Sequence, residues 1–312
     1  MNLQQLRIIR ETVRHGFNLT DTANALFTAQ SGVSKHIKDL EDELGMELFI
    51  RHGKRLLGLT EPGKELLPIC ERILLDIQNV KRLGEQFAQQ DKGRLTIAAT
   101  HTQARYRLPS VVGQFRQEFP KVHLELRQCD PKEIVSLLHF GEADIGLATE
   151  ALGEETDLVS FPFYQWQHAI VVPDGHPLAA DTLPVTLEAV ADYPIITYHG
   201  GYTGRARIDT AFANAGLVPD IVMSALDADV IKSYVELGLG VGIIAAMAFH
   251  PTRDAGLRLL EAPGLFPLNT TRIALKRGHY LRGYALRFIE CCAPELNPAR
   301  VMEAVFPRVG IE

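Results

Sequence analysis

Hydroxyl and amide side chains follow several predicted strands in the C-terminal two thirds of the chain, and together they could hold a small oxyanion. They are Thr100, Thr102 and Gln103 after a first strand, Thr149 at the end of a third, and Thr203 in a glycine-containing loop that opens a helix. Trp166, between two sets of strands, adds an indole N–H to this set. Such donors suit an anion because backbone N–H groups and the positive helix end favour negative charge. Each threonine alone could be a helix cap, but their convergence at equivalent strand ends favours a binding site.

A second set of side chains, near the N-terminus, could bind nucleic acid. A predicted helix that starts near residue 30 carries hydrogen-bond donors in its first half and acidic residues in its second half, so the acidic end should face away from phosphate. The donors are Gln30, Ser31, Ser34, Lys35 and Lys38. Residues 48–59 are predicted to form two strands around a turn, and their charges are all positive: Arg51, Lys54 and Arg55. A basic hairpin of this kind suits contact with the DNA backbone.

Three predicted helices position the N-terminal donors. Apolar residues at helical spacing predict a helix over 3–15, a short helix over 19–26 follows, and the third helix buries an apolar stripe before it closes at Gly45. A supporting helix, two short helices and a basic hairpin match a winged helix-turn-helix, in which the second short helix enters a major groove. The alternative is an ordinary helical bundle with a solvated basic face. The order of the elements favours DNA binding.

The connector between the two parts of the chain is a long predicted helix. Thr60 is placed as its N-cap and Pro62 in its first turn, where the missing N–H does no harm. An apolar stripe continues to about Gln89, which corresponds to about 42 Å of helix, although Pro68 should bend the helix or loosen its early hydrogen bonds. The simplest cover for the stripe is the same helix of a second subunit, which would pair two recognition helices. Packing within the same chain is the alternative.

From residue 94 onward, strands alternate with helices, which predicts a doubly wound α/β domain. Ligands in such sheets bind at the carboxyl ends of the strands, which is where the hydroxyl and amide residues lie. The glycine-rich run 238–242 precedes an apolar stretch and not a helix, so close backbone packing is favoured over a nucleotide loop. Asp227 and Asp229 are interpreted as helix-capping residues.

The composition excludes several classes of protein. The 312 residues suggest about two domains, 46% are apolar, 22% are charged, and the mean hydropathy is +0.01. These values are typical of soluble globular proteins and not of disordered, collagenous or membrane proteins. The formal charge of −6 means that any DNA binding must come from a local basic surface.

Catalytic and metal motifs are not found in the sequence. The four cysteines form no C-x-x-C pair, so neither a disulfide framework nor a zinc site is expected. The motifs of serine hydrolases, P-loop proteins and zincins are missing. We expect a cytoplasmic protein without a signal peptide, membrane span, metal or cofactor.

Several segments resemble the LysR-type transcriptional regulators over essentially the full chain. The family signature is similar to ALFTAQSGVSKHIKDLEDELGMELFIR at residues 25–51, followed by GKRLLGLTEPG. Other segments resemble the CysB branch of the family, whose members regulate sulfur assimilation. These segments are THTQARY from Thr100, ADIGLATEAL from Ala143, YTGR from Tyr202, DTAF from Asp209 and DADVIKSYVELGLGVGIIA from Asp227.

The resemblance implies a winged helix-turn-helix over residues 1–59, a dimerising linker helix over 60–92, and a two-lobed effector domain, like periplasmic binding proteins, over 93–312. Lobe I takes about 93–164 and 268–312, and lobe II about 165–267. Ligand positions of the branch carry over to Thr100, Thr102, Gln103, Thr149, Trp166 and Thr203.

The implied function is control of sulfur-assimilation or cysteine-biosynthesis genes by a homotetramer that binds promoter DNA. The implied effectors are sulfate, thiosulfate, adenosine phosphosulfate and acetylserine, and RNA polymerase is a candidate further partner. Two other classes stay open at this point. A cytoplasmic small-anion-binding protein would bind ligand without specific DNA binding, and an α/β enzyme would turn its ligand over.

Overall fold

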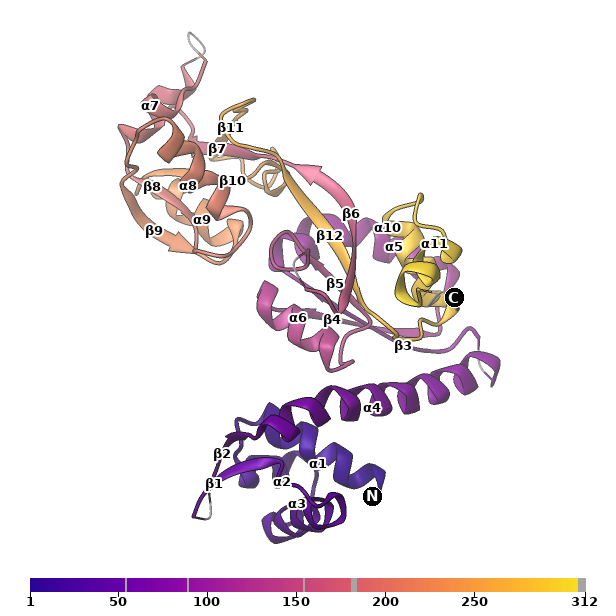
Figure 1. Cartoon of the computed structure of the whole chain (residues 1–312). Helices are drawn as coiled ribbons and strands as arrows, with labels where there is room; N and C mark the ends of the chain where they lie inside the picture. Colours follow the sequence, from indigo (N-terminus) through magenta and orange to yellow (C-terminus); the bar gives the residue numbers. More distant parts are fainter. Residues whose placement is uncertain (54, 89, 154, 181–183, 308–312) are drawn as a thin grey trace. The chain divides into compact units, whose positions relative to one another are not determined.

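The structure is a computed structural model that describes residues 1–53, 55–88, 90–153, 155–180 and 184–307 (Figure 1). Lys54 and Gln89, two residues named in the predictions above, lie outside this part. The chain divides into two compact units, of which the first covers Met1–Gly84 and the second begins at Glu85. Among the described residues, no helix combines the length and apolar character that a bilayer span needs.

The first unit contains the predicted three helices and hairpin. They are α1 (Leu3–Arg14), α2 (Leu19–Ala25), α3 (Gln30–Leu44), β1 (Phe49–His52) and β2 (Arg55–Leu59), and α4 (Glu61–Ala88) follows them. Asn18 caps α2 with its side chain, and Gly45 ends α3 in the left-handed conformation at φ +65°. The strands β1 and β2 pair antiparallel. The winged helix-turn-helix predicted from the sequence is therefore confirmed.

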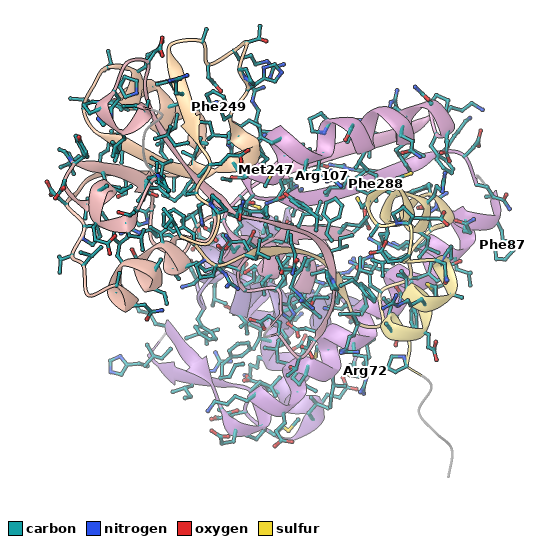
Figure 2. All side chains as sticks on the ribbon, turned by 90° about the horizontal axis from the view of Figure 1, so that it is seen from above. Arg72, Phe87, Arg107, Met247, Phe249 and Phe288 are labelled. Atoms are coloured by element: carbon teal, nitrogen blue, oxygen red, sulfur yellow. The ribbon has the colours of Figure 1, made fainter. Side chains whose placement is uncertain are left out.

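The helix α4 runs for 28 residues with Pro68 inside it. Thr60 accepts the N–H of Gly63 at 3.1 Å, as the predicted cap requires. Cys70 and Leu74 are buried with Leu6 of α1. Other apolar side chains of α4 are exposed, including Val80 at 70% and Phe87 at 78%, and Figure 2 labels Phe87 on this helix. The stripe is thus only partly covered within one chain.

The second unit contains two mixed five-stranded sheets. The first sheet has the order β4-β3-β5-β12-β6 and the second has the order β11-β7-β10-β8-β9. We name the body built on each sheet the first lobe and the second lobe. The first sheet consists of β3 (Gly93–Ala99), β4 (Val122–Gln128), β5 (Ile145–Ala148), β6 (Leu158–Trp166) and β12 (Asn269–Lys276). The second sheet consists of β7 (His168–Pro173), β8 (Ile195–Tyr198), β9 (Ile221–Ala225), β10 (Val241–Ala245) and β11 (Leu257–Leu260).

Helices complete the two lobes. The first lobe has the π-helix η1 (Gln103–Arg107), α5 (Leu108–Glu118), α6 (Pro131–His139), α10 (Gly283–Cys292) and α11 (Pro298–Val305). The second lobe has the 3-10 helices η2 (Pro177–Ala179) and η3 (Ala246–Ala248), and the helices α7 (Leu187–Ala191), α8 (Arg205–Asn214) and α9 (Ala228–Glu236). The predicted alternation is confirmed by the parallel pairs of β3 with β4 and β5, and of β8 with β9 and β10.

The strand β6 was not predicted from the sequence. It contains Pro162, which removes a ladder hydrogen bond, and such strands are placed at sheet edges. The structure agrees, because β6 is the last strand of its sheet and its pairing with β12 shifts register beside Pro162. The antiparallel ribbon of β6 and β12 carries the chain toward the second lobe and back (Figure 1).

The glycine-rich run 238–242, which continues into β10, is a packing feature, as expected. A Cβ on Gly240 would lie 2.4 Å from the carbonyl oxygen of Pro194, and one on Gly242 would lie 2.5 Å from Val171. These glycines let β10 approach its neighbours closely, so the interpretation of the run as backbone packing is confirmed.

Candidate functional site

The predicted ligand residues of the second unit lie where strand ends of the two lobes meet. Thr100, Thr102 and Gln103 follow β3, Thr149 follows β5, and Thr203 precedes α8. Thr102 and Thr203 are both almost fully buried, and their hydroxyl oxygens lie 3.3 Å apart. Since β3 belongs to the first lobe and α8 to the second, this pair joins the lobes directly. Thr100 is buried beside them in the chain, and its carbonyl accepts the N–H of Gln103.

Trp166 reaches Thr149 through a third residue. The indole N–H of Trp166 donates to the hydroxyl of Thr271 at 3.1 Å, and that hydroxyl lies 3.4 Å from the hydroxyl of Thr149. The indole donor is therefore already engaged within the protein. Trp166 positions Thr149 through Thr271, which lies on β12 and was missed from the sequence.

Gln103 is held by a tyrosine of β6. Its side-chain oxygen accepts the hydroxyl of Tyr164, which also lies 3.4 Å from the sulfur of Met247 in the second lobe. The guanidinium carbon of Arg107 lies 5.0 Å from the centroid of the Tyr164 ring. Figure 2 labels Arg107 and Met247, which both contact Tyr164. The side-chain oxygen of Gln103 accepts from Tyr164, so the amide N–H groups are what Gln103 can offer to a ligand. The π-helix that carries it is a geometry common at functional sites.

The backbone of Thr203 is strained. Its φ is +44°, which is unfavourable for a β-branched residue. His168 holds it by donating from Nε2 to the Thr203 carbonyl at 2.9 Å. Burial lowers the pKa of His168 to about 4, so the ring is neutral at pH 7 and its Nδ1 can accept from the Asn269 amide, 3.4 Å away. The strained loop is thus fixed by residues from β7 and β12.

Glu150 adds a carboxylate between the two halves of the site. It follows Thr149 in the first lobe, and its Oε1 accepts the backbone N–H of Gly204 in the second lobe. Burial raises the pKa of Glu150 above its ordinary value, while the Gly204 N–H and the nearby Arg207 oppose this shift. The strand-end rule that selected Thr149 also reaches the next residue, so Glu150 could have been found from the sequence.

A second interlobe contact joins η1 to α9. Tyr106 donates its hydroxyl to Asp229 at 2.7 Å, and Lys232 and Arg105 lie 3.2 and 3.4 Å from the same carboxylate. Burial alone would raise the pKa of Asp229, but the hydrogen bonds from Tyr106 and Lys232 and the positive charges lower it. Asp227 caps α9, as predicted, but the capping role expected for Asp229 is wrong, because this residue lies in the first turn of α9 and binds Tyr106 of η1.

His101, Asp227 and Asp229 bring potential metal-ligand atoms within 4.8 Å of one another. Two cations already balance the charge of Asp229 in the contact with η1. A bound metal ion would have to compete with both of them. The cluster therefore fits an interlobe ion-pair network better than a metal site.

The donors of α3 lie on one face of the first unit. Gln30, Ser31, Lys35 and Lys38 are exposed and Ser34 is half-buried, while the opposite side of the helix fills the core. No side-chain hydrogen bond from Ala29 caps the start of α3. The carbonyl of Ala29 accepts the N–H groups of Gly32 and Val33 at 2.9 and 3.1 Å. The positive partial charge of a helix start suits a DNA phosphate.

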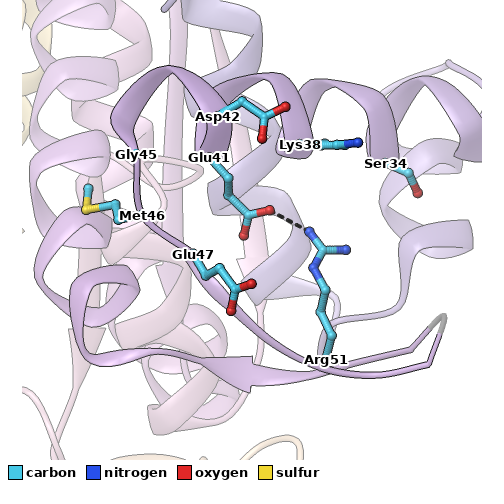
Figure 3. Close-up of a pocket in the computed structure, with 8 residues that line it drawn as sticks. All are labelled: Ser34, Lys38, Glu41, Asp42, Gly45, Met46, Glu47 and Arg51. Atoms are coloured by element: carbon cyan, nitrogen blue, oxygen red, sulfur yellow. Dashed lines mark hydrogen bonds and ion pairs between the residues drawn. The ribbon is translucent and has the colours of Figure 1, made fainter.

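The hairpin is tied to α3 by Glu41 (Figure 3). This buried carboxylate accepts the N–H groups of Leu48 and Phe49 at 2.8 and 3.3 Å and binds Arg51 at 2.6 Å. Arg51, predicted only as a DNA contact, therefore also has a structural partner. Arg55 is exposed, and Lys54 lies outside the described residues.

Comparison with known proteins identifies the family of the chain. Residues 3–64 match the model described as bacterial regulatory helix-turn-helix protein, lysR family, and residues 88–297 match the LysR substrate binding domain. The chain belongs to the LysR family. It is 58% identical over 301 residues to the HTH-type transcriptional regulator SsuR of Burkholderia cenocepacia, with 96% of this chain and 97% of the relative covered.

Further relatives agree with this assignment. HTH-type transcriptional regulator CysB of the same organism is 53% identical over 305 residues, which cover 98% of this chain and 97% of CysB. The solved cofactor-binding domain of the Cbl transcriptional regulator is 49% identical, with a TM-score of 0.67, and covers 69% of this chain and 94% of that domain. The predicted LysR family and CysB branch are confirmed. This LysR-type regulator is a DNA-binding transcriptional regulator and not an enzyme.

Other residues at the sites were missed from the sequence. His168, Asn269 and Thr271 lie far along the chain from the threonines that they support, and no local pattern marks them. Phe27 of the LysR-type regulator lies between α2 and α3. It is 97% exposed with φ +51°, and two residues separate it from the recognition helix α3. An exposed aromatic residue at this position could contact DNA beside α3.

Proposed function

We propose that this LysR-type regulator controls genes of sulfur assimilation or cysteine biosynthesis, and that a small sulfur-related anion or acetylserine between the lobes modulates its activity. The observation that carries the effector site is the pairing of Thr102 with Thr203 across the lobes. The relatives named CysB, SsuR and Cbl support the choice of genes.

The proposed organisation follows the expected boundaries. Residues 1–59 bind promoter DNA, residues 60–92 form a linker helix that dimerises, and residues 93–312 bind the effector. The exposed apolar side chains of α4 support pairing with a second copy. We further propose a cytoplasmic homotetramer that recruits or contacts RNA polymerase.

The proposed mechanism is a change in lobe closure. An anion held by Thr100, Thr102, Gln103 and Thr149 from the first lobe and by Thr203 from the second contacts both lobes at once. A ligand shifts such an equilibrium only by its difference in affinity for the two states. Thr102 and Thr203 bond to each other across the lobes, so an anion that binds both hydroxyls must replace this contact by stronger ones.

Titration of a promoter complex tests the function. The full-length regulator is bound to a promoter fragment from a sulfur-assimilation operon at fixed salt, and sulfate, adenosine phosphosulfate and acetylserine are added in turn. We expect at least one of them to change the affinity or the footprint. Tight binding that ignores all three would overturn the effector assignment, and failure to bind any such promoter would overturn the choice of genes.

Replacement of Thr149 by Val tests the effector site. The substitution keeps the shape of the side chain and removes the hydroxyl that faces Thr271, and we expect effector affinity to fall about tenfold, the usual effect of one lost hydrogen bond to a charged group. Fluorescence of Trp166, the only tryptophan in the sequence, reports binding. Thr100→Val should behave alike, and exposed Thr252→Val is the control. Unchanged affinity in both site variants would refute the site.

Replacement of Lys35 by Ala tests the recognition helix. Lys35 is exposed on α3, and loss of one phosphate contact should weaken DNA binding and reduce the slope of log K against log salt by about one. The measurement is a filter or anisotropy titration at several salt concentrations. Lys132→Ala, which removes an exposed lysine of α6, should bind DNA as the parent does. If Lys35→Ala and Lys132→Ala bind DNA with equal affinity at moderate salt, α3 is not the recognition helix.

A further inference from the structure

Glu150 places a negative charge inside the candidate effector site. The residue follows Thr149 at the end of β5, and its Oε1 accepts the N–H of Gly204, the neighbour of Thr203. The carboxylate therefore lies between the threonines of the first lobe and Thr203 of the second. Its bond to Gly204 also occupies the start of α8, where the positive helix end would otherwise face a bound anion.

The second oxygen of this carboxylate lacks a donor. Oε2 of Glu150 is buried and accepts no hydrogen bond from any residue in the described part of the chain. A carboxylate oxygen withdrawn from water without a partner is costly. Arg207 acts on it only at a distance, as a charge. The site thus holds an acceptor that a ligand could satisfy, provided that the ligand carries a donor.

We propose that Glu150 determines the class of effector: an anion that also carries an N–H or O–H group, whose donor binds Oε2. The inference rests on the proposed function and selects among its ligands. Sulfate and thiosulfate are fully ionised at neutral pH and offer acceptors only, so they meet Oε2 with like charge and no proton. Acetylserine carries N–H or O–H donors. Sites built to bond a donor reject analogues that lack it.

Two tetrahedral anions of the same shape provide a matched test. Inorganic phosphate keeps a P–OH group at neutral pH, whereas sulfate has none. For the wild-type full-length protein, Trp166 fluorescence should show binding of phosphate and of acetylserine about tenfold tighter than binding of sulfate, or more. This comparison uses no variant. If sulfate binds as tightly as phosphate and acetylserine do, the inference is overturned.

Glu150→Gln then identifies the residue responsible. The amide keeps an acceptor for Gly204 and a similar shape but removes the charge and adds a donor. We expect sulfate affinity to rise about tenfold and the preference for acetylserine to shrink by a similar factor. Exposed Glu303→Gln makes the same charge change on α11 and should leave both affinities unchanged. A thermal melt without ligand confirms that the variants are folded.

The outcomes separate the two proposals. If all ligands bind and Glu150→Gln leaves their ranking unchanged, the inference about Glu150 fails and the effector site stands. If no ligand changes the Trp166 emission of either protein and calorimetry detects no binding, the proposed effector class fails and the inference with it.

Discussion

Gly204→Ala is expected to destabilise the second unit and to abolish effector binding. A Cβ at this position would lie 2.3 Å from Oδ1 of Asn269 and 2.8 Å from Cε1 of His168, and φ is +70°. Left-handed backbone costs a residue with a Cβ about 1–2 kcal/mol, and overpacking adds about 1–3 kcal/mol. The loss should appear as about 2–5 kcal/mol in denaturant unfolding followed by Trp166 fluorescence, since both terms act at one buried position.

Two neighbouring glycines separate strain from crowding. Gly201 also has positive φ, at +84°, but its Cβ would meet nothing within 4 Å, and Gly200 has open space without positive φ. Gly201→Ala should therefore show the strain term alone, and Gly200→Ala should resemble the parent. If Gly204→Ala is as stable as Gly201→Ala and still binds effector, the close packing of Asn269 against this loop is needed neither for stability nor for effector binding.

The elements of the first unit could be predicted nearly to the residue because their signals are local. The polar first half and apolar stripe of α3 lie in consecutive residues, and Gly45 marks its end by its own conformation. The same holds for the strand ends of the second unit, where Thr100 and Thr149 lie directly beyond β3 and β5. Such features depend on backbone propensity and periodicity, which a single sequence displays.

The rest depends on pairings between distant parts of the chain. The link from Trp166 to Thr149 needs Thr271, more than one hundred residues away, and requires that β6 and β12 pair in one register. The strand β6 carries Pro162, which weakens the strand pattern in the sequence. The direction of the Glu150 side chain is fixed by a backbone N–H of the other lobe, a group that every residue but proline has. The place of Glu150 after β5 could be read from the sequence, but the direction of its side chain could not.

Glu41→Ala is expected to weaken both the fold of the first unit and its affinity for DNA. The substitution removes the acceptor of two backbone N–H groups, at Leu48 and Phe49, and the partner of Arg51. A buried donor left unsatisfied costs about 1–3 kcal/mol, so the domain should lose about 2–4 kcal/mol of stability when relaxation recovers part of the two penalties. Thermal unfolding and DNA titration at fixed salt measure the two effects.

Glu41→Gln distinguishes the backbone bonds from the ion pair. The amide oxygen can still accept the N–H of Leu48, so the stability of the domain should fall less than in Glu41→Ala. The neutral amide no longer attracts the guanidinium of Arg51. The hairpin is then held less firmly against α3, and the affinity for DNA should change. Asp42→Ala removes the next, exposed carboxylate of the same helix and should leave stability within about 0.5 kcal/mol of the parent. If Glu41→Ala proves as stable as Asp42→Ala, the hairpin is held by its apolar residues alone. If Glu41→Gln matches Glu41→Ala instead, the ion pair between Glu41 and Arg51, and not the backbone bonds, fixes the hairpin against the recognition helix.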